Sequence, residues 1–436
     1  MRLLLLALLC VPAVAVAQPQ KLTLEQVIAK TLVGPRARMA QSDVGAAEAR
    51  VSEANAARLP RIQATAFGTI SPEINCLDAA CTETDPQNFA WDFDGLLGGA
   101  QLEVTQPLYT FGKISHARAA ARAGVAAQRA LTAETAGDLA VDAARAYWGV
   151  KVARELGFML DDGIDEIQKA LTRLEEGTGQ AEVSVQDRQR IAVLLAEAKV
   201  QRADAQMAES HALAGLRALT GVPEADVDDA ELAPVERPVP EKVDSEGRPQ
   251  AVAAAAGAEA ADQLAQLAAS YYWPDVALVG TAAVARAQGV DDPPSVFAND
   301  PFNRTSAGLI LALRWTAEPW NVKARVDRAK AEATKARAQS ELARVGATYD
   351  AQLALTEATA AYAKVQAASD GEKAARTWLA SVLQAEAIGT AEPRELADAY
   401  IAWFQMRARW AQAVNQWNVA VVRIDRASGA IQPPAR

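Results

Sequence analysis

The sequence predicts a mixed, mainly α-helical fold in which short β-strands alternate with very long helices, arranged as two internal repeats. Three observations support this prediction. Residues 113–176 contain no proline and are rich in alanine, so they can form helix over roughly 95 Å at 1.5 Å per residue. Several runs of about ten residues alternate apolar and polar side chains, as half-buried strands do. Landmarks of the sequence also recur: Lys113 returns as Lys323, and Gly179 returns as Gly389.

The chain begins MRLLLLALLCVPAVAVAQ, which has the pattern of a secretory signal peptide. One arginine precedes an apolar run, and small residues end at Ala17, so we expect residues 1–17 to be cleaved. The alternative is a membrane anchor, but the apolar run is shorter than the roughly 18–20 residues that a helical span needs. We therefore expect the mature protein to be exported.

The first predicted repeat, residues 18–222, starts with a helix that ends at the corner Leu59-Pro60. A β-hairpin follows at 61–108, with strands at about 61–70 and 99–108 and a polar loop at 71–97. A long helical hairpin is predicted at 113–220, and its tip lies near 177–180, where glycines permit a tight reversal.

The second predicted repeat, residues 251–429, follows an acidic, proline-rich linker at 223–250 and precedes a tail at 430–436. Its elements come in the same order: a helix to Trp273-Pro274, a β-hairpin at 275–315 with a loop at 287–303, and a helical hairpin at 320–428 with its tip near 388–392. Thr390 is the expected N-cap of the last helix, because Pro393 suits a first helical turn. Along that helix four residues fall seven apart, as in a packed coiled-coil seam: Trp403, Trp410, Trp417 and Ile424.

Composition argues against several functions. The formal net charge is −10, and loss of Arg2 with the signal peptide lowers it to −11, so nucleic acid is not an expected partner. The sequence contains no phosphate-binding loop, no nucleophile elbow and no histidines paired at metal-ligand spacing. We expect no catalytic residue, no cofactor and no metal site. Cys76 and Cys81 are candidates for a disulfide in an oxidising compartment, and two free thiols are the alternative.

The predicted strands cannot form a closed structure within one chain. Leu309, Leu311 and Leu313 alternate with more polar or smaller residues, and Ile62 and Ala64 do the same in the first hairpin. Strands of about ten residues can cross a bilayer only in a closed barrel, because lipid leaves unpaired backbone groups unsatisfied. Since four strands are too few for a barrel with an open interior, the sequence leaves two possibilities: two soluble hairpins, or a barrel shared among several chains.

The order of elements, the duplicated halves, the stretch QPLYTFGK entering a long helix, and the glycine turns GTGQAEVSVQ and IGTAEPRELADA resemble the TolC-like outer-membrane efflux proteins. The resemblance implies a homotrimer with a twelve-stranded transmembrane β-barrel, continued by a long periplasmic α-helical barrel. It implies that Pro107 and Gly112 mark the end of a membrane strand and the start of a tunnel helix. It also implies the outer membrane of a Gram-negative cell as the location, with outer-membrane lipid as a partner.

Two sets of site residues follow from the resemblance. The tip turns would contact a periplasmic adaptor protein: Gly177, Thr178, Gly179, Ile388, Gly389 and Thr390. Glu395 and Asp398 match the positions at which the family narrows its pore, and three copies would form a ring of carboxylates. The alternatives are ordinary helix-hairpin turns and a solvated acidic helix face. Three tryptophans near strand ends, Trp273, Trp315 and Trp320, would lie near the periplasmic edge of the barrel or in simple packing contacts.

The resemblance implies an exit duct: an outer-membrane channel of a tripartite efflux or type I secretion system, which passively conducts substrates from an adaptor and an inner-membrane pump. The alternative is a soluble periplasmic coiled-coil adaptor or scaffold, which would share the helical hairpins but should carry a lipoyl-like β-rich module. No such module is evident in the sequence.

Overall fold

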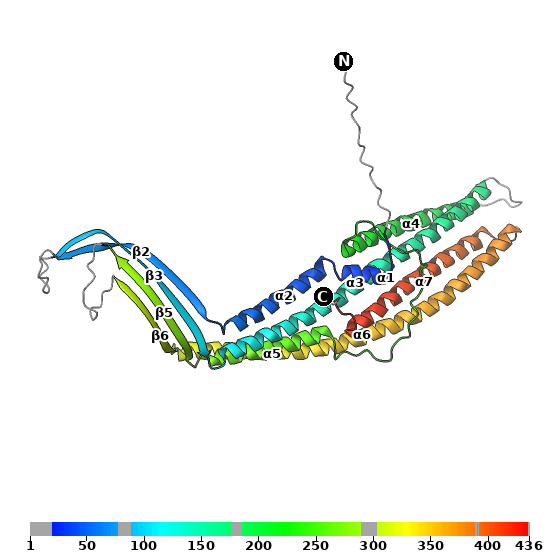
Figure 1. Cartoon of the computed structure of the whole chain (residues 1–436). Coiled ribbons are helices and arrows are strands. Elements are labelled where there is room, and N and C mark those ends of the chain that lie inside the picture. The colour runs from blue at the N-terminus through cyan, green and yellow to red at the C-terminus, as the bar shows by residue number, and fades with distance from the viewer. Residues whose placement is uncertain are drawn as a thin grey trace, which may run out of the picture. The chain divides into compact units, whose positions relative to one another are not determined.

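The computed structural model describes residues 20–76, 89–175, 185–288, 303–388, 390 and 392–434. The predicted signal peptide lies outside these ranges. The chain is mainly helical, and the order helix, strand, strand, long helix, helix occurs twice, from α2 to α4 and from α5 to α7 (Figure 1). The elements are β1 (Gln20–Leu22), α1 (Leu24–Thr31), α2 (Pro35–Ala56), β2 (Arg61–Cys76), β3 (Phe89–Tyr109), α3 (Lys113–Glu175), α4 (Val185–Thr220), β4 (Ala225–Val227), α5 (Pro249–Ser270), β5 (Asp275–Ala287), β6 (Arg304–Arg314), α6 (Pro319–Ala387) and α7 (Pro393–Ala427).

The chain divides into two compact units, and several long helices run through both. The first, which we call the strand unit, comprises residues 45–127 and 254–340. The second, which we call the helical unit, comprises residues 1–44, 128–253 and 341–436.

The strand unit contains a four-stranded antiparallel sheet in the order β2-β3-β5-β6 (Figure 1). The pairing of β3 with β5 joins the two predicted hairpins. Short polar contacts join the helices of the same unit. His116 of α3 lies 3.0 Å from Gln263 of α5, and Arg337 of α6 forms an ion pair of 2.6 Å with Asp262 of α5.

The first hairpin has longer strands than the sequence predicts. The loop was expected at 71–97, but β2 continues to Cys76 and β3 begins at Phe89, and these two residues face each other in the ladder. The register shifts between Ser71 and Glu73. Pro72 has no N–H group to give to a ladder, so a bulge at this point lets pairing resume beyond it. The proline and the polar residues around it interrupt the alternation on which the prediction rested.

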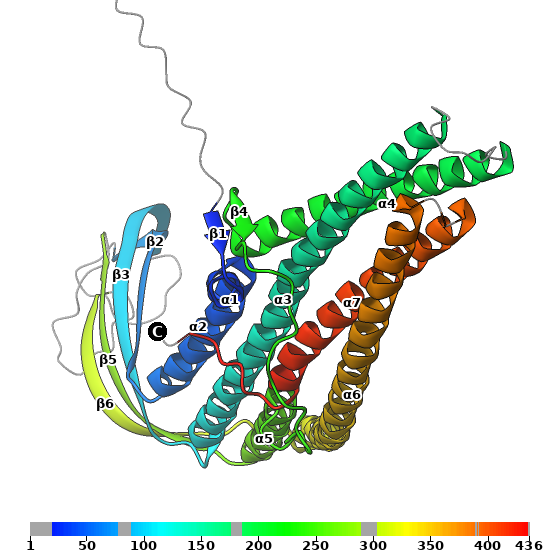
Figure 2. The ribbon, with the colours of Figure 1, turned by 90° about the vertical axis from the view of Figure 1, so that its right-hand side faces the viewer.

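The helical unit is held by a core that contains several fully buried apolar side chains. Its largest members include Trp417, Leu139, Leu216, Ile167 and Val150. At one side of this core β1 pairs in parallel with β4, and α1 follows β1 (Figure 2). Thr23 and Gln26 form a reciprocal capping box at the start of α1, which satisfies backbone N–H groups that helix geometry leaves free. The predicted linker thus contains a short paired strand, and α5 begins at its end.

Among the described residues, no helix combines the length and the apolar character that a membrane-spanning helix requires.

Candidate functional site

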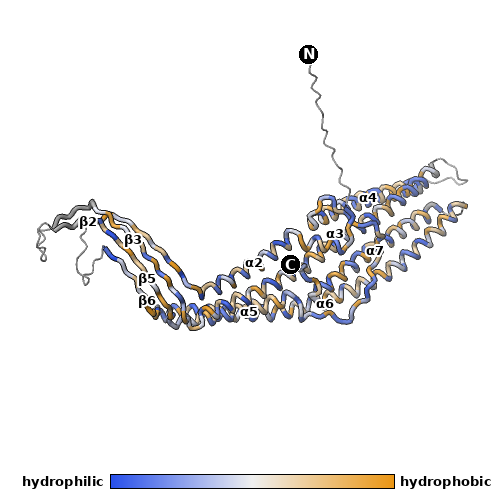
Figure 3. The backbone as a smooth tube through the Cα atoms, viewed as in Figure 1, coloured by the Kyte–Doolittle hydropathy of each residue, from blue (hydrophilic) through white to orange (hydrophobic). Residues whose placement is uncertain are grey.

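The sheet of the strand unit has one apolar face and one more polar face. Residues that lie opposite each other in a ladder point to the same side of the sheet. One row across the four strands is therefore Ile62, Val104, Gly280 and Leu309, whereas the next row is Gln63, Glu103, Thr281 and Gly308. Polar and apolar residues alternate visibly along the strands (Figure 3). The apolar face carries Ile62, Ala64, Ala66, Gly68, Ile70, Leu96, Gly98, Ala100, Leu102, Val104, Val276, Leu278, Gly280, Ala282, Val284, Ala307, Leu309, Leu311 and Leu313, together with the polar residues Gln106, Arg286 and Thr305.

Most of the large side chains of the apolar face are exposed in the single chain, and Val104, Val276 and Leu278 are half-buried. Ile62 is 70% exposed, Leu309 and Leu311 are each 69% exposed, and Leu313 is 68% exposed. Soluble proteins rarely expose contiguous apolar patches of this kind, and such patches mark contact with lipid or with another protein. The alternation noticed along 62–66 and 309–315 therefore places its apolar side chains together on one face.

The two outer strands of the sheet, β2 and β6, each have one neighbour in the described chain. Each consequently presents a row of N–H and C=O groups to its open side. An open edge of this kind is a template for pairing with another chain, and in lipid it would leave backbone groups without partners.

The junction between β3 and α3 is built as the sequence predicts, and Gly112 is its turning point. Phe111 has a φ of 47° and Gly112 a φ of 93°, a conformation that glycine adopts without strain. Pro107 lies in the ladder just before a register shift, so its missing N–H falls where pairing is already interrupted. Lys113 then donates to the carbonyl oxygen of Trp273 at 3.0 Å and to Asp275 Oδ1 at 2.9 Å.

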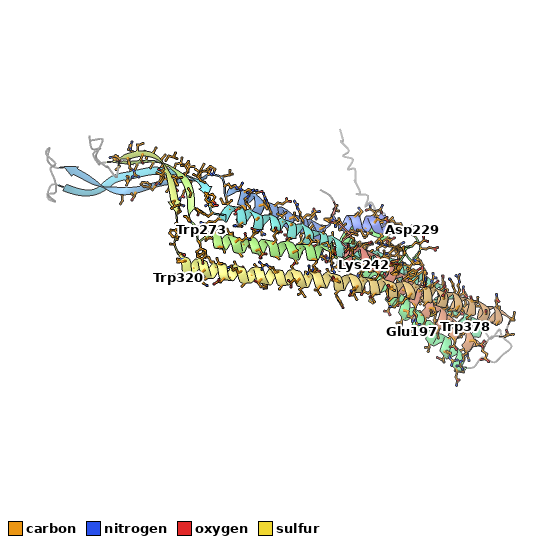
Figure 4. All side chains as sticks on the ribbon, turned by 90° about the horizontal axis from the view of Figure 1, so that it is seen from below. Glu197, Asp229, Lys242, Trp273, Trp320 and Trp378 are labelled. Carbon is orange, nitrogen blue, oxygen red and sulfur yellow. The ribbon has the colours of Figure 1, made fainter. Side chains whose placement is uncertain are left out.

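The second junction differs from the first. Lys323, which the sequence matches with Lys113, is the fifth residue of α6; it is exposed and pairs at 2.7 Å with Asp327 of its own helix. Trp273 stacks on Phe111 with ring centroids 5.8 Å apart. Trp315 and Trp320 are exposed, and Figure 4 shows Trp273 beside the start of β5 and Trp320 at the start of α6. Simple core packing does not account for Trp315 and Trp320 in the single chain.

Most of the predicted tip residues lie outside the described residues, namely Gly177, Thr178, Gly179 and Gly389. Ile388 is 76% exposed. Thr390 does not cap α7, contrary to the prediction: its hydroxyl donates to the carbonyl oxygen of Ala385 at 3.1 Å, so it completes the end of α6. Glu392 is the N-cap of α7, and its side chain makes no capping hydrogen bond.

Glu395 and Asp398 lie in the first turns of α7, and both are exposed. A spacing of three residues places them on one side of the helix. Arg394 Nε lies 3.8 Å from Asp398 Oδ2 in an exposed pair, so part of the acidic charge is compensated within the chain. Their role in a pore stays a prediction, as does the disulfide, because Cys81 lies outside the described residues.

The segment 226–237 forms a polar clamp that the sequence analysis missed. On α7, Trp417 Nε1 donates to the carbonyl oxygen of Val235 at 2.9 Å, and the Asn418 amide receives a hydrogen bond from Val235 N at 2.8 Å. Arg237 forms an ion pair with Asp425 further along α7. The available signal was the buried apolar residues within an otherwise acidic stretch, Val227 and Leu232. We call residues 226–237 the clamp segment.

The clamp segment is fixed to α3 through Lys151, whose side chain is only 4% exposed. Its ammonium group donates to Asp228 Oδ1 at 2.5 Å, to Asp228 O at 3.2 Å and to Ala230 O at 2.5 Å. The Tyr147 hydroxyl donates to Asp228 Oδ2 at 2.9 Å. Burial raises the pKa of Asp228, but the hydrogen bonds from Lys151, Tyr147 and the Ala230 amide outweigh it and hold that pKa below its ordinary value. Burial, followed by the bond to Asp228, raises the pKa of Tyr147.

The tryptophan seam of α7 is a packing feature. Trp417 and Ile424 are buried, and Trp403 and Trp410 pack against the core clusters beside them. Two glycines on the neighbouring helices make room for α7 side chains. A Cβ on Gly163 of α3 would lie 2.1 Å from the Phe404 ring, and one on Gly371 of α6 would lie 2.1 Å from the Met406 methyl group.

No group of three or more His, Cys, Asp or Glu side chains in the described ranges is arranged to hold a metal ion. A groove of about 760 Å³ lies between α4 and α7 in the helical unit. It is lined by residues that include Val193, Ile401, Phe404, Arg190 and Arg409. Nothing in its lining forms a catalytic arrangement.

Comparison with known proteins agrees with this geometry. Residues 245–430 match the family described as outer membrane efflux protein, whereas no curated protein sequence matches the chain. The CmeC outer membrane channel of Campylobacter jejuni is 14% identical with a TM-score of 0.76, and the match covers 95% of this chain and 87% of that one. The outer membrane protein VceC of Vibrio cholerae is 18% identical with a TM-score of 0.75 and coverage of 93% and 96%. The open-state MtrE outer membrane channel of Neisseria gonorrhoeae is 17% identical with a TM-score of 0.76 and coverage of 95% and 90%.

These identities show a shared fold, and the family match covers the second half of the chain. Together they confirm the resemblance predicted from the sequence: residues 245–430 match the outer membrane efflux protein family, and the chain shares the fold of these outer-membrane channels.

Proposed function

We propose that three copies of this chain form an exit duct across the outer membrane. Each copy contributes four strands to one twelve-stranded barrel, and its long helices line a tunnel that extends into the periplasm. The duct conducts substrates passively, and a periplasmic adaptor with an inner-membrane pump supplies them.

The observation that carries this proposal is that the sheet exposes its apolar face instead of burying it. Its exposed apolar face suits lipid, its more polar face suits a water-filled interior, and its two open edges can be satisfied only by other copies. Twelve strands enclose a wider interior than the eight that side chains can fill. A soluble periplasmic adaptor, the alternative function, would leave the same apolar face in water, which disfavours it.

Partner contacts belong to this proposal. The tip turns, Gly177–Gly179 and Ile388–Thr390, would meet the adaptor, because glycine turns allow the close helix reversal that presents a narrow tip. Glu395 and Asp398 of the three copies would form a ring of six carboxylates near the narrow end of the tunnel. Carboxylates held near one another repel, so such a ring favours passing cations and resists closure.

The proposal is tested by location and by assembly. The full chain, expressed in a Gram-negative host, should sediment with outer membranes and should have the mass of a trimer in detergent, and it should open water-filled pores in planar bilayers. A monomer that is soluble without detergent would contradict the duct.

A matched pair of substitutions tests the two faces of the sheet. Leu311→Lys and Ile310→Lys add the same charge to adjacent positions of β6, and both side chains are exposed in the single chain. Leu311 lies on the apolar face and Ile310 on the opposite one. A lysine facing lipid near the membrane centre costs about 2–4 kcal/mol, whereas lumen positions tolerate it. We expect Leu311→Lys to reduce outer-membrane assembly strongly and Ile310→Lys to change only ion conduction; equal effects would contradict the assignment of faces.

A further inference from the structure

The open edges of β2 and β6 must pair with something if the sheet closes into a barrel. We infer that β6 of one copy pairs with β2 of a second copy in one fixed register, with Arg314 opposite Thr65 of the second copy. This inference rests on the proposed function, because it concerns how the copies join. It adds the register of the contact between copies, residue by residue, which we derive from the strand pairing within one chain.

The template is the ladder between β3 and β5, where the first half of the chain already meets the second. There Thr105 lies opposite Val279. If the two halves are equivalent, the contact of β6 with the next β2 is the same contact, made between copies. In the contact between copies, β2 of the second copy takes the place that β5 has in the template, and β6 takes the place of β3.

The equivalence of individual residues follows from the hairpins. Arg61 and Asp275 each follow a corner proline and begin the first strand of a hairpin. Arg61 pairs with Thr105, and Asp275 pairs with Arg314, so Arg314 corresponds to Thr105. Val279 is the fifth residue of β5, and Thr65 is the fifth residue of β2. The template pair of Thr105 with Val279 therefore becomes Arg314 with Thr65 of the second copy.

The resulting seam agrees with the two faces of the sheet. Antiparallel pairing from Arg314–Thr65 sets Leu313 opposite Ala66, Leu311 opposite Gly68 and Leu309 opposite Ile70 of the second copy. These pairs join residues that belong to the apolar face in both strands. A slip by one residue would set these leucines opposite residues of the other face of β2, among them Thr65 and Thr69, so it is excluded by the same physics that fixes register in any half-buried sheet. Slips by two residues keep the faces, and only the template distinguishes them.

Strand length also fits. The eleven residues of β6 lie opposite residues 65–75 in this register, and β2 spans Arg61–Cys76. The whole length of β6 thus faces strand residues of β2, although Pro72 offers no N–H group.

Cysteine cross-linking tests the register in the full chain with Cys76 and Cys81 replaced by serine. The seam pair is Arg314→Cys with Thr65→Cys. The shifted pairs are Ala312→Cys with Thr65→Cys and Arg314→Cys with Phe67→Cys. The template pair, Thr105→Cys with Val279→Cys, should close within one chain and shows that the sheet has folded. Directly opposite residues have Cβ atoms about 4.5–5.5 Å apart. Diagonal residues lie about 7–8 Å apart, which is beyond ordinary disulfide reach.

We expect oxidation in isolated membranes to link copies through the seam pair and this band to be lost in both shifted pairs. Cross-linking between copies that is strongest in a shifted pair would overturn the register and leave the multi-copy duct intact. A template disulfide with no link between copies in any variant, in a protein that is monomeric in detergent, would overturn the duct as well.

Discussion

Replacing Lys151 with methionine should open the clamp segment while leaving the rest of the chain folded. The substitution keeps the apolar stem and removes an ammonium group that is almost fully buried. Three acceptors lose the lysine donor, namely Asp228 Oδ1, Asp228 O and Ala230 O, and Asp228 Oδ1 keeps the hydrogen bond from the Ala230 amide. The Tyr147 hydroxyl still donates to the carboxylate.

The cost can be worked from these contacts. Removing one partner of a buried ion pair costs about 3–5 kcal/mol. Asp228 keeps a quarter of its side chain in solvent, and its remaining hydrogen bonds reduce the loss, so we expect about 2–4 kcal/mol for closing the clamp segment. A loss of about 3 kcal/mol raises the population of the locally open form by about two orders of magnitude.

Limited proteolysis measures the population of this locally open form. Trypsin can cut after the exposed Lys242, which precedes the buried Val243 just beyond the clamp segment; Figure 4 labels Lys242 and Asp229. Under conditions in which opening is fast relative to cleavage, the cleavage rate should rise by about a hundredfold in Lys151→Met.

The matched control is Lys21→Met, because Lys21 pairs with Asp229 in a solvent-exposed contact beside the same segment. Exposed pairs contribute about 0–1 kcal/mol, so its cleavage rate should change little. Equal cleavage in Lys151→Met and in the unsubstituted protein would refute the reasoning, and so would equal acceleration by both substitutions. In the double variant Lys151→Met, Asp228→Asn, part of the loss should be recovered, since no charge is then left without its partner.

Three further outcomes are expected. Glu395→Gln with Asp398→Asn should lower cation preference about threefold, as a charge about 6 Å from a passing ion attracts it by roughly 0.7 kcal/mol in water; an unchanged reversal potential in planar bilayers would remove both residues from the pore. Gly163→Ala should lower the temperature of thermal unfolding, because its Cβ would overlap an α7 phenylalanine ring at a cost of about 1–3 kcal/mol, whereas Gly124→Ala in the same helix meets nothing within 4 Å and should be neutral or stabilising. Because the pKa of Asp228 is lowered in the folded chain, its carboxylate contributes stability above its unfolded pKa of about 3.9, and this contribution is lost as pH falls through the lower folded value. Circular dichroism melts in detergent should therefore show a larger loss on acidification for the native protein than for Asp228→Asn; equal losses would contradict a stabilising role for the carboxylate.

The sheet was largely predictable because its evidence is local. Alternation along 62–66 and 309–313 identified the apolar side of β2 and β6, and the ladder confirms that the apolar residues of these runs share a face. Gly112 was recognisable as a turning point because few other residues accept its backbone conformation. The extra length of β2 was missed because Pro72 interrupts the alternation without ending the pairing.

Features that depend on distant partners could not be predicted. The clamp segment owes its position to Lys151 on α3 and to Trp417 and Asn418 on α7, each more than seventy residues away. The composition of the clamp segment by itself indicates a solvated acidic linker. The capping role predicted for Thr390 was wrong for a related reason. As an N-cap, its hydroxyl oxygen would accept from backbone N–H groups of α7, but the hydroxyl instead donates to the Ala385 carbonyl at the end of α6.

The two open edges of the sheet are different surfaces, since one belongs to β2 and the other to β6. A contact between unlike surfaces joins copies head to tail, so each added copy offers a free edge to the next one. The assembly closes into a ring only when the rotation between neighbouring copies divides a full circle; otherwise it grows as an open helix. For such a head-to-tail contact, the number of copies in a closed ring depends on the angle between neighbouring copies and not on how strongly the edges pair. Two edges of unlike sequence therefore leave the count of copies to the geometry of the sheet.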